Sequence, residues 1–196
     1  MSDTLAKLAS ADLGAIRPHL ALADAPAALI AATPSVPEAF AALEANGFLL
    51  EAAKLLGHAL PKRQAVWWAC MCALHTAPDT LPESHRKVRE ASEAWVRQQT
   101  DPVRRSAMSM AESIGFETPE SWTAIAAFWS GDSMTPADQP KLPPPAHLTG
   151  VAVAGVIGLS AVRGDPKRQT ARLQRFLESG RNIAAGGPGR LTPEDA

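Results

Sequence analysis

Apolar residues recur every three or four positions along most of the chain, which is the spacing of amphipathic α-helices. In the segment 119–130, for example, Trp122, Ile125, Ala126 and Trp129 fall on one face of a helix. No stretch alternates apolar and polar residues over six positions, as a half-buried strand does. The pattern therefore predicts an all-α fold.

Capping signals divide the chain into short helices. Ser35 begins a capping box, and Asp101 precedes a proline at a first helical position. Gly115 and Gly180 follow apolar-periodic stretches and are typical helix ends. The predicted helices comprise residues 5–10, 25–33, 36–46, 48–59, 62–76, 83–99, 102–114, 119–130, 150–163 and 166–183, of which the first two have the weakest signals.

Two of these helices are apolar on every side. The segments Ala65–Leu74 and Val151–Val162 contain no charged residue, so we expect both to be buried and to lie together at the centre of the fold. Gly150, Ala154 and Gly158 are spaced four apart and predict a bare face that a neighbouring helix approaches closely.

Proline and glycine mark two segments that are not helical. Residues 131–148 include Pro143–Pro145, a run that favours polyproline II. We interpret this segment as a strap that wraps the domain and docks on tryptophans, and the alternative is a linker between two lobes. From Gly186 onward the chain is polar and rich in glycine and proline. The sequence thus predicts a single helical domain over residues 1–185 and a disordered, flexible tail over residues 186–196.

Composition narrows the class of protein. Among 196 residues, 20 acidic side chains balance 19 basic ones to give a net charge of −1, which argues against nucleic-acid binding. The N-terminal residues resemble no signal peptide, and no apolar segment reaches the roughly 20 residues that span a bilayer. We expect a cytoplasmic protein that binds no membrane.

The residues show no complete catalytic or metal-binding motif. Cys70, Cys72 and His75 have a metal-like spacing, but on a helix the two cysteines point about 200° apart, so burial in the core is the better interpretation. Phosphate-binding glycine loops are missing from the sequence. We therefore expect no metal, no cofactor and no enzymatic activity. The alternative is a small helical enzyme with a pocket near Trp67, Trp68 and His75.

The histidines give no further motif. They are scattered along the chain, and we expect structural or solvated roles for them. They are His19, His58, His75, His85 and His147.

Basic pairs at helix starts are the unusual feature of the charge pattern, because the helix macrodipole disfavours cations there. Exposed tryptophans beside such pairs are typical anchors for a partner. The hypothetical partner-binding residues are Lys62, Arg63, Trp67, Trp68, Arg104, Arg105, Trp129, Lys167 and Arg168. In the alternative interpretation the charges are solvated, with Asp101 and Asp165 compensating two pairs, and the tryptophans belong to the core.

Several motifs together resemble a known group of proteins. They are WWAC within residues 60–70, AAFWSG at 126–131 and PPAHLTG at 144–150, with Trp95 and the segment 115–119 in addition. Over residues 45–187 the chain resembles a family of small, uncharacterised proteobacterial proteins encoded near type VI secretion genes. The resemblance implies an accessory or adaptor role beside the effector-loading and spike-tip components of that machine. It carries over no catalytic residue.

Overall fold

The computed structural model describes residues 5–194, and within that range it contains helices and no β-strand. The prediction of an all-α fold is thus confirmed. In order, the elements are α1 (Leu13–Ile16), the 3-10 helix η1 (Arg17–His19), α2 (Asp24–Leu29), α3 (Val36–Ala45), α4 (Leu49–Ala59), α5 (Lys62–His75), α6 (Glu83–Gln98), α7 (Asp101–Ile114), α8 (Pro119–Trp129), α9 (Leu148–Val162), the 3-10 helix η2 (Pro166–Arg168) and α10 (Gln169–Ala184).

The N-terminal region differs from the expectation. Residues 5–10 are not helical; instead the amide of Lys7 donates to the carbonyl of Ala184, and that of Ala9 donates to the carbonyl of Ala59. These contacts with the ends of α10 and α4 use amides that a local helix would need. The first helix begins later, at α1, where the Asp12 side chain caps the amide of Gly14.

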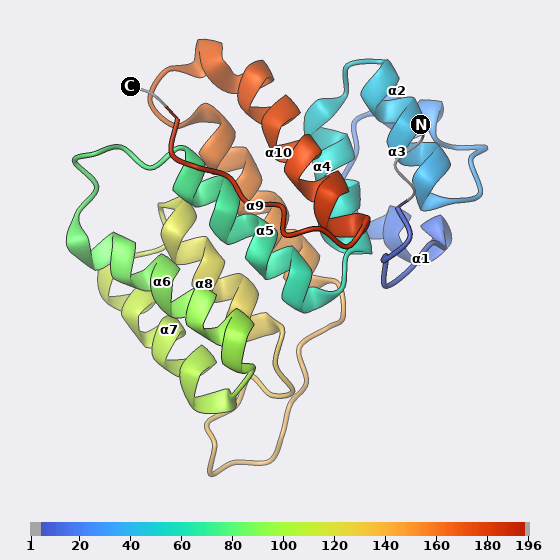
Figure 1. Ribbon diagram of the computed structural model, residues 1–196. Coiled ribbons are helices and arrows are strands. Elements are labelled where there is room, and N and C mark those ends of the chain that lie inside the picture. The colour runs from blue at the N-terminus through green and yellow to red at the C-terminus, as the bar shows by residue number, and fades with distance from the viewer. Residues whose placement is uncertain (1–4, 195–196) are drawn as a thin grey trace.

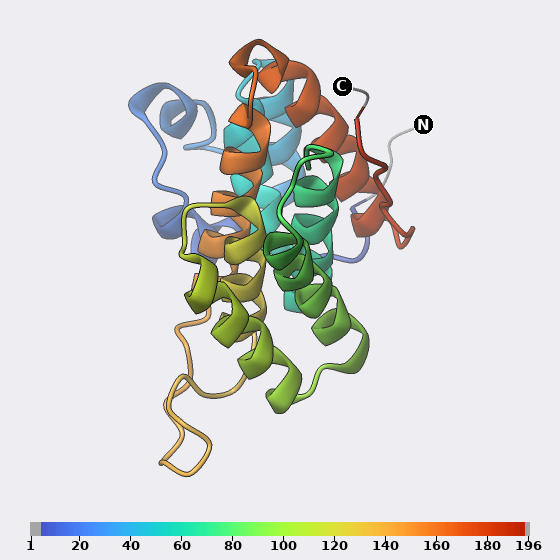
Figure 2. The same ribbon diagram turned by 90° about the vertical axis from the view of Figure 1, so that its left-hand side faces the viewer.

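The predicted central pair is confirmed, because α5 and α9 pack against each other in the middle of the fold. Cys70, Val153 and Ile157 are completely buried. On one side α4 and α10 cover this pair, and on the other side α6, α7 and α8 form a second group of helices (Figures 1 and 2). The exposed residues of α9 are Val151 and Val162 near its ends, and its middle is buried or half-buried. Within the described residues no single helix is both long and apolar enough to cross a membrane.

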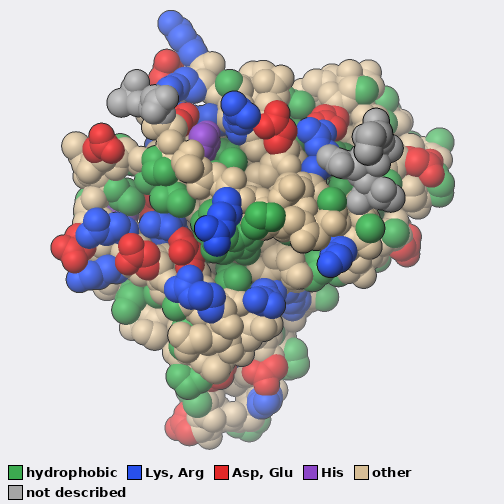
Figure 3. Space-filling model, viewed as in Figure 1, with side chains coloured by type: hydrophobic (Ala, Val, Ile, Leu, Met, Phe, Trp, Pro, Cys, Tyr) green, Lys and Arg blue, Asp and Glu red, His purple; other side chains and the backbone are tan. Residues whose placement is uncertain are grey.

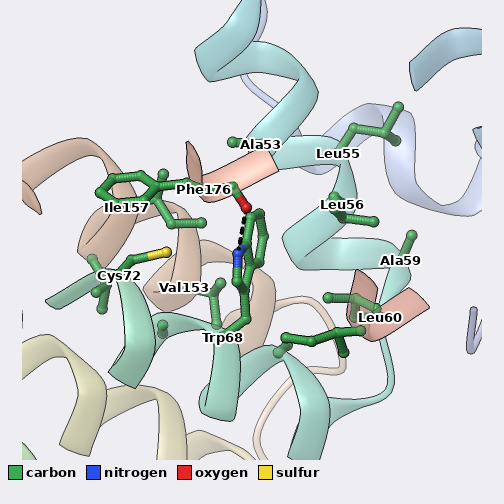
Figure 4. Close-up of a cluster of buried hydrophobic side chains, with 14 of the residues drawn as sticks. Ala53, Leu55, Leu56, Ala59, Leu60, Trp68, Cys72, Val153, Ile157 and Phe176 are labelled. Atoms are coloured by element: carbon green, nitrogen blue, oxygen red, sulfur yellow. Dashed lines mark hydrogen bonds between the residues drawn. The ribbon is translucent and has the colours of Figure 1, made fainter. Parts of the chain in front are cut away.

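Trp68 occupies the centre of the core (Figure 4). Its indole N–H donates to the carbonyl of Phe176 in α10 over 2.9 Å, so its polar atom is satisfied although the side chain is fully buried. A Cβ at Gly180 would lie 2.6 Å from Leu56 and 2.8 Å from the Trp68 ring. The sequence suggested that Gly180 ends a helix. It lies inside α10 instead, and its lack of a side chain lets that helix approach α4 and α5.

The prediction of a bare face along α9 is only partly correct. A side chain at Gly150 would overlap the His58 ring, and a Cβ at Gly155 would lie 2.8 Å from Trp122. Gly158 faces open space instead, so no neighbouring helix presses on it. The close approaches involve individual side chains of α4 and α8, which a spacing of four does not reveal.

The proline-rich segment joins α8 to α9, which are packed neighbours, so it does not link two lobes. Residues 136–143 are exposed and project from the end of the domain (Figures 1 and 2). The expected docking of a strap on tryptophans is therefore wrong for this part, although Pro144 is buried. We call residues 132–145 the projecting loop.

Residues 186–194, where we expected a disordered tail, lie along α5 and α10 (Figure 1). The indole N–H of Trp67 donates to the carbonyl of Pro188 over 2.7 Å, and the hydroxyl of Ser179 donates to that of Gly189 over 2.5 Å. Both acceptors are backbone carbonyls, which every residue has. The Gly/Pro-rich composition therefore does not predict these hydrogen bonds. Residues 195 and 196 lie outside the described part of the chain.

Candidate functional site

The residues predicted to bind a partner differ widely in exposure. Trp68 and Arg104 are buried and are not available to a partner in this conformation. Trp67 and Trp129 are half-buried against the core, whereas Lys167 is exposed. The burial of these tryptophans therefore favours the interpretation that they belong to the core over the interpretation that they are exposed anchors for a partner.

The basic pair in α7, Arg104 and Arg105, has a structural role. Arg104 donates to the carbonyls of Phe128 (2.9 Å) and Ser133 (2.7 Å), and its guanidinium lies 4.8 Å from the centre of the Phe128 ring. Asp101 pairs with both Arg104 and Arg105. The cations at the start of α7 are thus compensated, and Arg104 fastens the first residues of the projecting loop.

The projecting loop is also braced internally. The amide of Met134 donates to the carbonyl of Leu142 over 2.8 Å, and the hydroxyl of Thr135 donates to the carbonyl of Pro140 over 2.7 Å. Lys141 and Asp132 form an ion pair across its base. Leu142 remains 54% exposed at the point where the triple proline begins. The loop therefore presents an apolar, proline-flanked segment on a fixed support.

The three basic pairs do not converge. Arg63 donates to the carbonyl of Val96 near the end of α6, whereas Arg168 pairs with Glu194 (3.4 Å). The start of α7 lies at the lower end of the molecule in Figure 1 and η2 lies at the upper end. Over α6 the basic and acidic side chains are interleaved (Figure 3), as expected from pairs such as Lys87 with Glu83.

The place proposed for an enzyme pocket, beside Trp67 and His75, is taken by the C-terminal segment. The Nδ1–H of His75 donates to the carbonyl of Thr192 over 2.5 Å, and the amide of Glu194 donates to the carbonyl of His75. Hollows remain between this segment and α10, beside Arg175. His75 is half-buried and lines both hollows, but its Nδ1 atom is already hydrogen-bonded to the segment.

Both cysteines are free and buried in α5, and burial raises the pKa of each thiol. Within residues 5–194 no group of three His, Cys, Asp or Glu side chains is placed to hold a metal ion.

Three histidines that the sequence presents as scattered meet at one pocket. His19 ends η1, His58 lies in the last turn of α4, and His147 is the residue before α9. Together with Lys62, the first residue of α5, they line a pocket of about 220 Å³. We call it the histidine pocket.

Local structure brings each ring to the pocket. The guanidinium of Arg17 donates to three carbonyls, those of Ile30, Ala31 and Thr33, and this fixes η1. The bare backbone at Gly150 leaves room for the His58 ring. The triple proline directs the chain back from the projecting loop to His147.

The rings lie close enough to influence one another. Those of His19 and His147 stack with centroids 4.0 Å apart, and those of His19 and His58 with centroids 6.3 Å apart. The pKa of His58 falls from 6.5 to about 4, chiefly because burial disfavours the charged ring and further because His19 and His147 repel it. Burial also lowers the pKa of Lys62.

The fold and these features define an all-α domain with a braced projecting loop and a pocket lined by three histidines and a lysine. The family model described as "Family of unknown function (DUF6931)" matches residues 39–184, and the chain belongs to this family. The match includes His58, Lys62 and His147 but not His19. No curated protein and no solved structure matches the chain.

Proposed function

We propose that this protein is a non-enzymatic interaction protein whose projecting loop binds a protein partner. The observation that carries the proposal is the exposure of Leu142, at the start of the triple proline, on a loop fastened by Arg104. A proline-rich segment held in one conformation loses little entropy on binding, and aromatic-lined grooves recognise such segments.

The partner that fits this loop is a protein with an aromatic groove. The groove would receive Leu142 and Pro143. The resemblance to proteins encoded near type VI secretion genes supports a secretion-system component as that partner, and it supports an accessory or adaptor role in the cytoplasm.

An enzyme with a site near Trp67, Trp68 and His75 stays the alternative hypothesis. It is the weaker one, because Trp68 is buried in the core and the ring nitrogens Nε1 of Trp67 and Nδ1 of His75 already donate to carbonyls of the C-terminal segment.

Comparative affinity capture tests the proposal. The tagged protein, its Leu142→Asp variant and its Val162→Asp variant are each used for capture from the native host. Val162 is a matched control, because it is 43% exposed and lies at the end of α9 outside the loop. We expect the same partner with the unmodified protein and with Val162→Asp, and a loss of about tenfold or more with Leu142→Asp. Equal recovery with all three proteins would contradict the role of the loop.

A further inference from the structure

The histidine pocket gathers hydrogen-bond donors and one ammonium without a counter-charge. Among the described residues, its lining contains three imidazoles and Lys62 but no carboxylate. Within residues 5–194, Lys62 forms no ion pair, although burial already disfavours its charge. A partly buried ammonium is normally compensated by a group of opposite charge. This arrangement therefore indicates that an anion is its natural complement.

Two helix ends add to this field. Both α5 and α9 begin at the pocket, and their first-turn amides have no partner within the helix. Neither helix has a side-chain cap or an acidic residue in its first turn. By contrast, Ser35 and Thr118 cap α3 and α8 in the ordinary way. The positive ends of two helix dipoles thus face the same pocket as Lys62 and the three imidazoles.

From this juxtaposition we propose that the histidine pocket binds a small oxyanion, either free phosphate or a carboxylate, through His19, His58, His147 and Lys62. The imidazole N–H groups and the ammonium are donors to its oxygens. The volume of about 220 Å³ is below that of pockets for drug-sized ligands, so the ligand is a small ion rather than a nucleotide.

Binding of the anion is coupled to protonation. The groups that face His58 are His19 from η1, His147 from the start of α9 and Lys62 from α5, and each is neutral or positive. A bound anion offsets their mutual repulsion and raises the pKa of the rings, so protons are taken up with the ligand. Affinity for the anion therefore increases as the pH falls.

A metal ion fits this geometry poorly. The rings of His19 and His147 are parallel, with an interplanar angle of 4° and centroids 4.0 Å apart. Ring lone pairs lie in the ring planes, so those of two stacked rings lie in parallel planes and do not converge on one ion. Histidine ligands of zinc converge on a single point about 2.0–2.1 Å from each nitrogen.

Calorimetric titration with sulfate tests the proposal, because the charge of sulfate does not change between about pH 5 and about pH 8, so a change in affinity over this interval comes from the protein. We expect sulfate to bind roughly tenfold or more tightly near pH 5 than near pH 8. Sodium chloride at equal ionic strength is the control for screening. Parallel titrations with phosphate and acetate identify which class of oxyanion the pocket prefers.

Matched variants locate the site. Lys62→Gln and His58→Gln should each weaken sulfate binding about tenfold, whereas Lys167→Gln and His85→Gln, which lie outside the pocket, should leave it unchanged. Lys62 is half-buried at the first position of α5, so this variant keeps the core intact even if His58→Gln does not. Binding that is independent of pH, equal loss in the control variants, or zinc binding in place of sulfate would each overturn the proposal.

Discussion

The imidazole rings of His19 and His147 stack in parallel with their centroids 4.0 Å apart, although the two residues lie far apart in the sequence. This contact joins η1 to the start of α9 beside His58 in α4. It also places the return leg of the projecting loop next to the histidine pocket, because only the segment 143–146 separates Leu142 from His147.

Stability should depend on pH through His58. Its pKa is about 4 in the folded state and 6.5 in the unfolded chain, so the unfolded state binds more protons between these values. The stabilisation from the neutral ring is complete above pH 6.5 and is lost as the pH falls toward 4. The pKa shift of His58 corresponds to roughly 3 kcal/mol of unfolding free energy at most. Solvent around the half-buried ring reduces this contribution.

Urea unfolding at several pH values checks this expectation. His58→Gln should flatten the decline in unfolding free energy over that interval, and His85→Gln should not. If the plots of unfolding free energy against pH are parallel for His58→Gln and the unmodified protein, the His58 ring does not cause the decline in stability.

Gly180 should be intolerant of any side chain. The change Gly180→Ala places a methyl group against Leu56 and the buried Trp68 ring, and we expect it to destabilise the fold by roughly 1–3 kcal/mol. Gly158→Ala is the matched control in α9: it meets open space and should stabilise the helix by up to about 1 kcal/mol. Thermal unfolding of both variants measures the contrast, and equal effects would contradict the packing described here.

Arg104 should support the projecting loop. Arg104→Met removes its bonds to the carbonyls of Phe128 and Ser133 and leaves Asp101 near the apolar replacement. We expect a loss of about 1–3 kcal/mol of stability, because two carbonyls lose their donor, together with faster amide exchange at Leu142. Arg104→Lys keeps the charge without the planar fork and should give a smaller loss. If the rate of amide exchange at Leu142 is unchanged in Arg104→Met, then Arg104 does not hold the loop in place.

The C-terminal segment should depend on Glu194. Hydrogen bonds from Arg172 lower the pKa of this carboxyl, so the contact is present above its ordinary value of 4.5 and is lost as the pH falls. Glu194→Gln should weaken the docked segment by roughly 1–3 kcal/mol and speed amide exchange at Gly189, whose N–H donates to Asn182. Glu178→Gln, which alters an exposed pair with Arg175, is the control. Equal exchange in both variants would mean that the salt bridge does not hold the segment.

Much of the fold follows from the sequence because helical periodicity and burial are local properties. The apolar segment around Trp68 and Cys70 predicted a central helix, and that helix is α5. The role of Arg104 was not predictable, because its partners Phe128 and Ser133 come from a different helix and from the loop after it.

The histidine pocket was missed for a similar reason. His19, His58 and His147 share no local spacing, so only the fold brings them together. Two signals pointed toward it: a lysine at the start of α5 and the bare backbone of Gly150. Neither identifies three histidines as one group without the tertiary structure.

Photo-cross-linking in the native host tests whether the projecting loop contacts a protein partner. A photoreactive amino acid replaces Leu142 in one protein and Val162, the exposed control outside the loop, in another. We predict a cross-linked product with one protein species from position 142 and its absence from position 162. No product from position 142, or the same products from both positions, would contradict the claim.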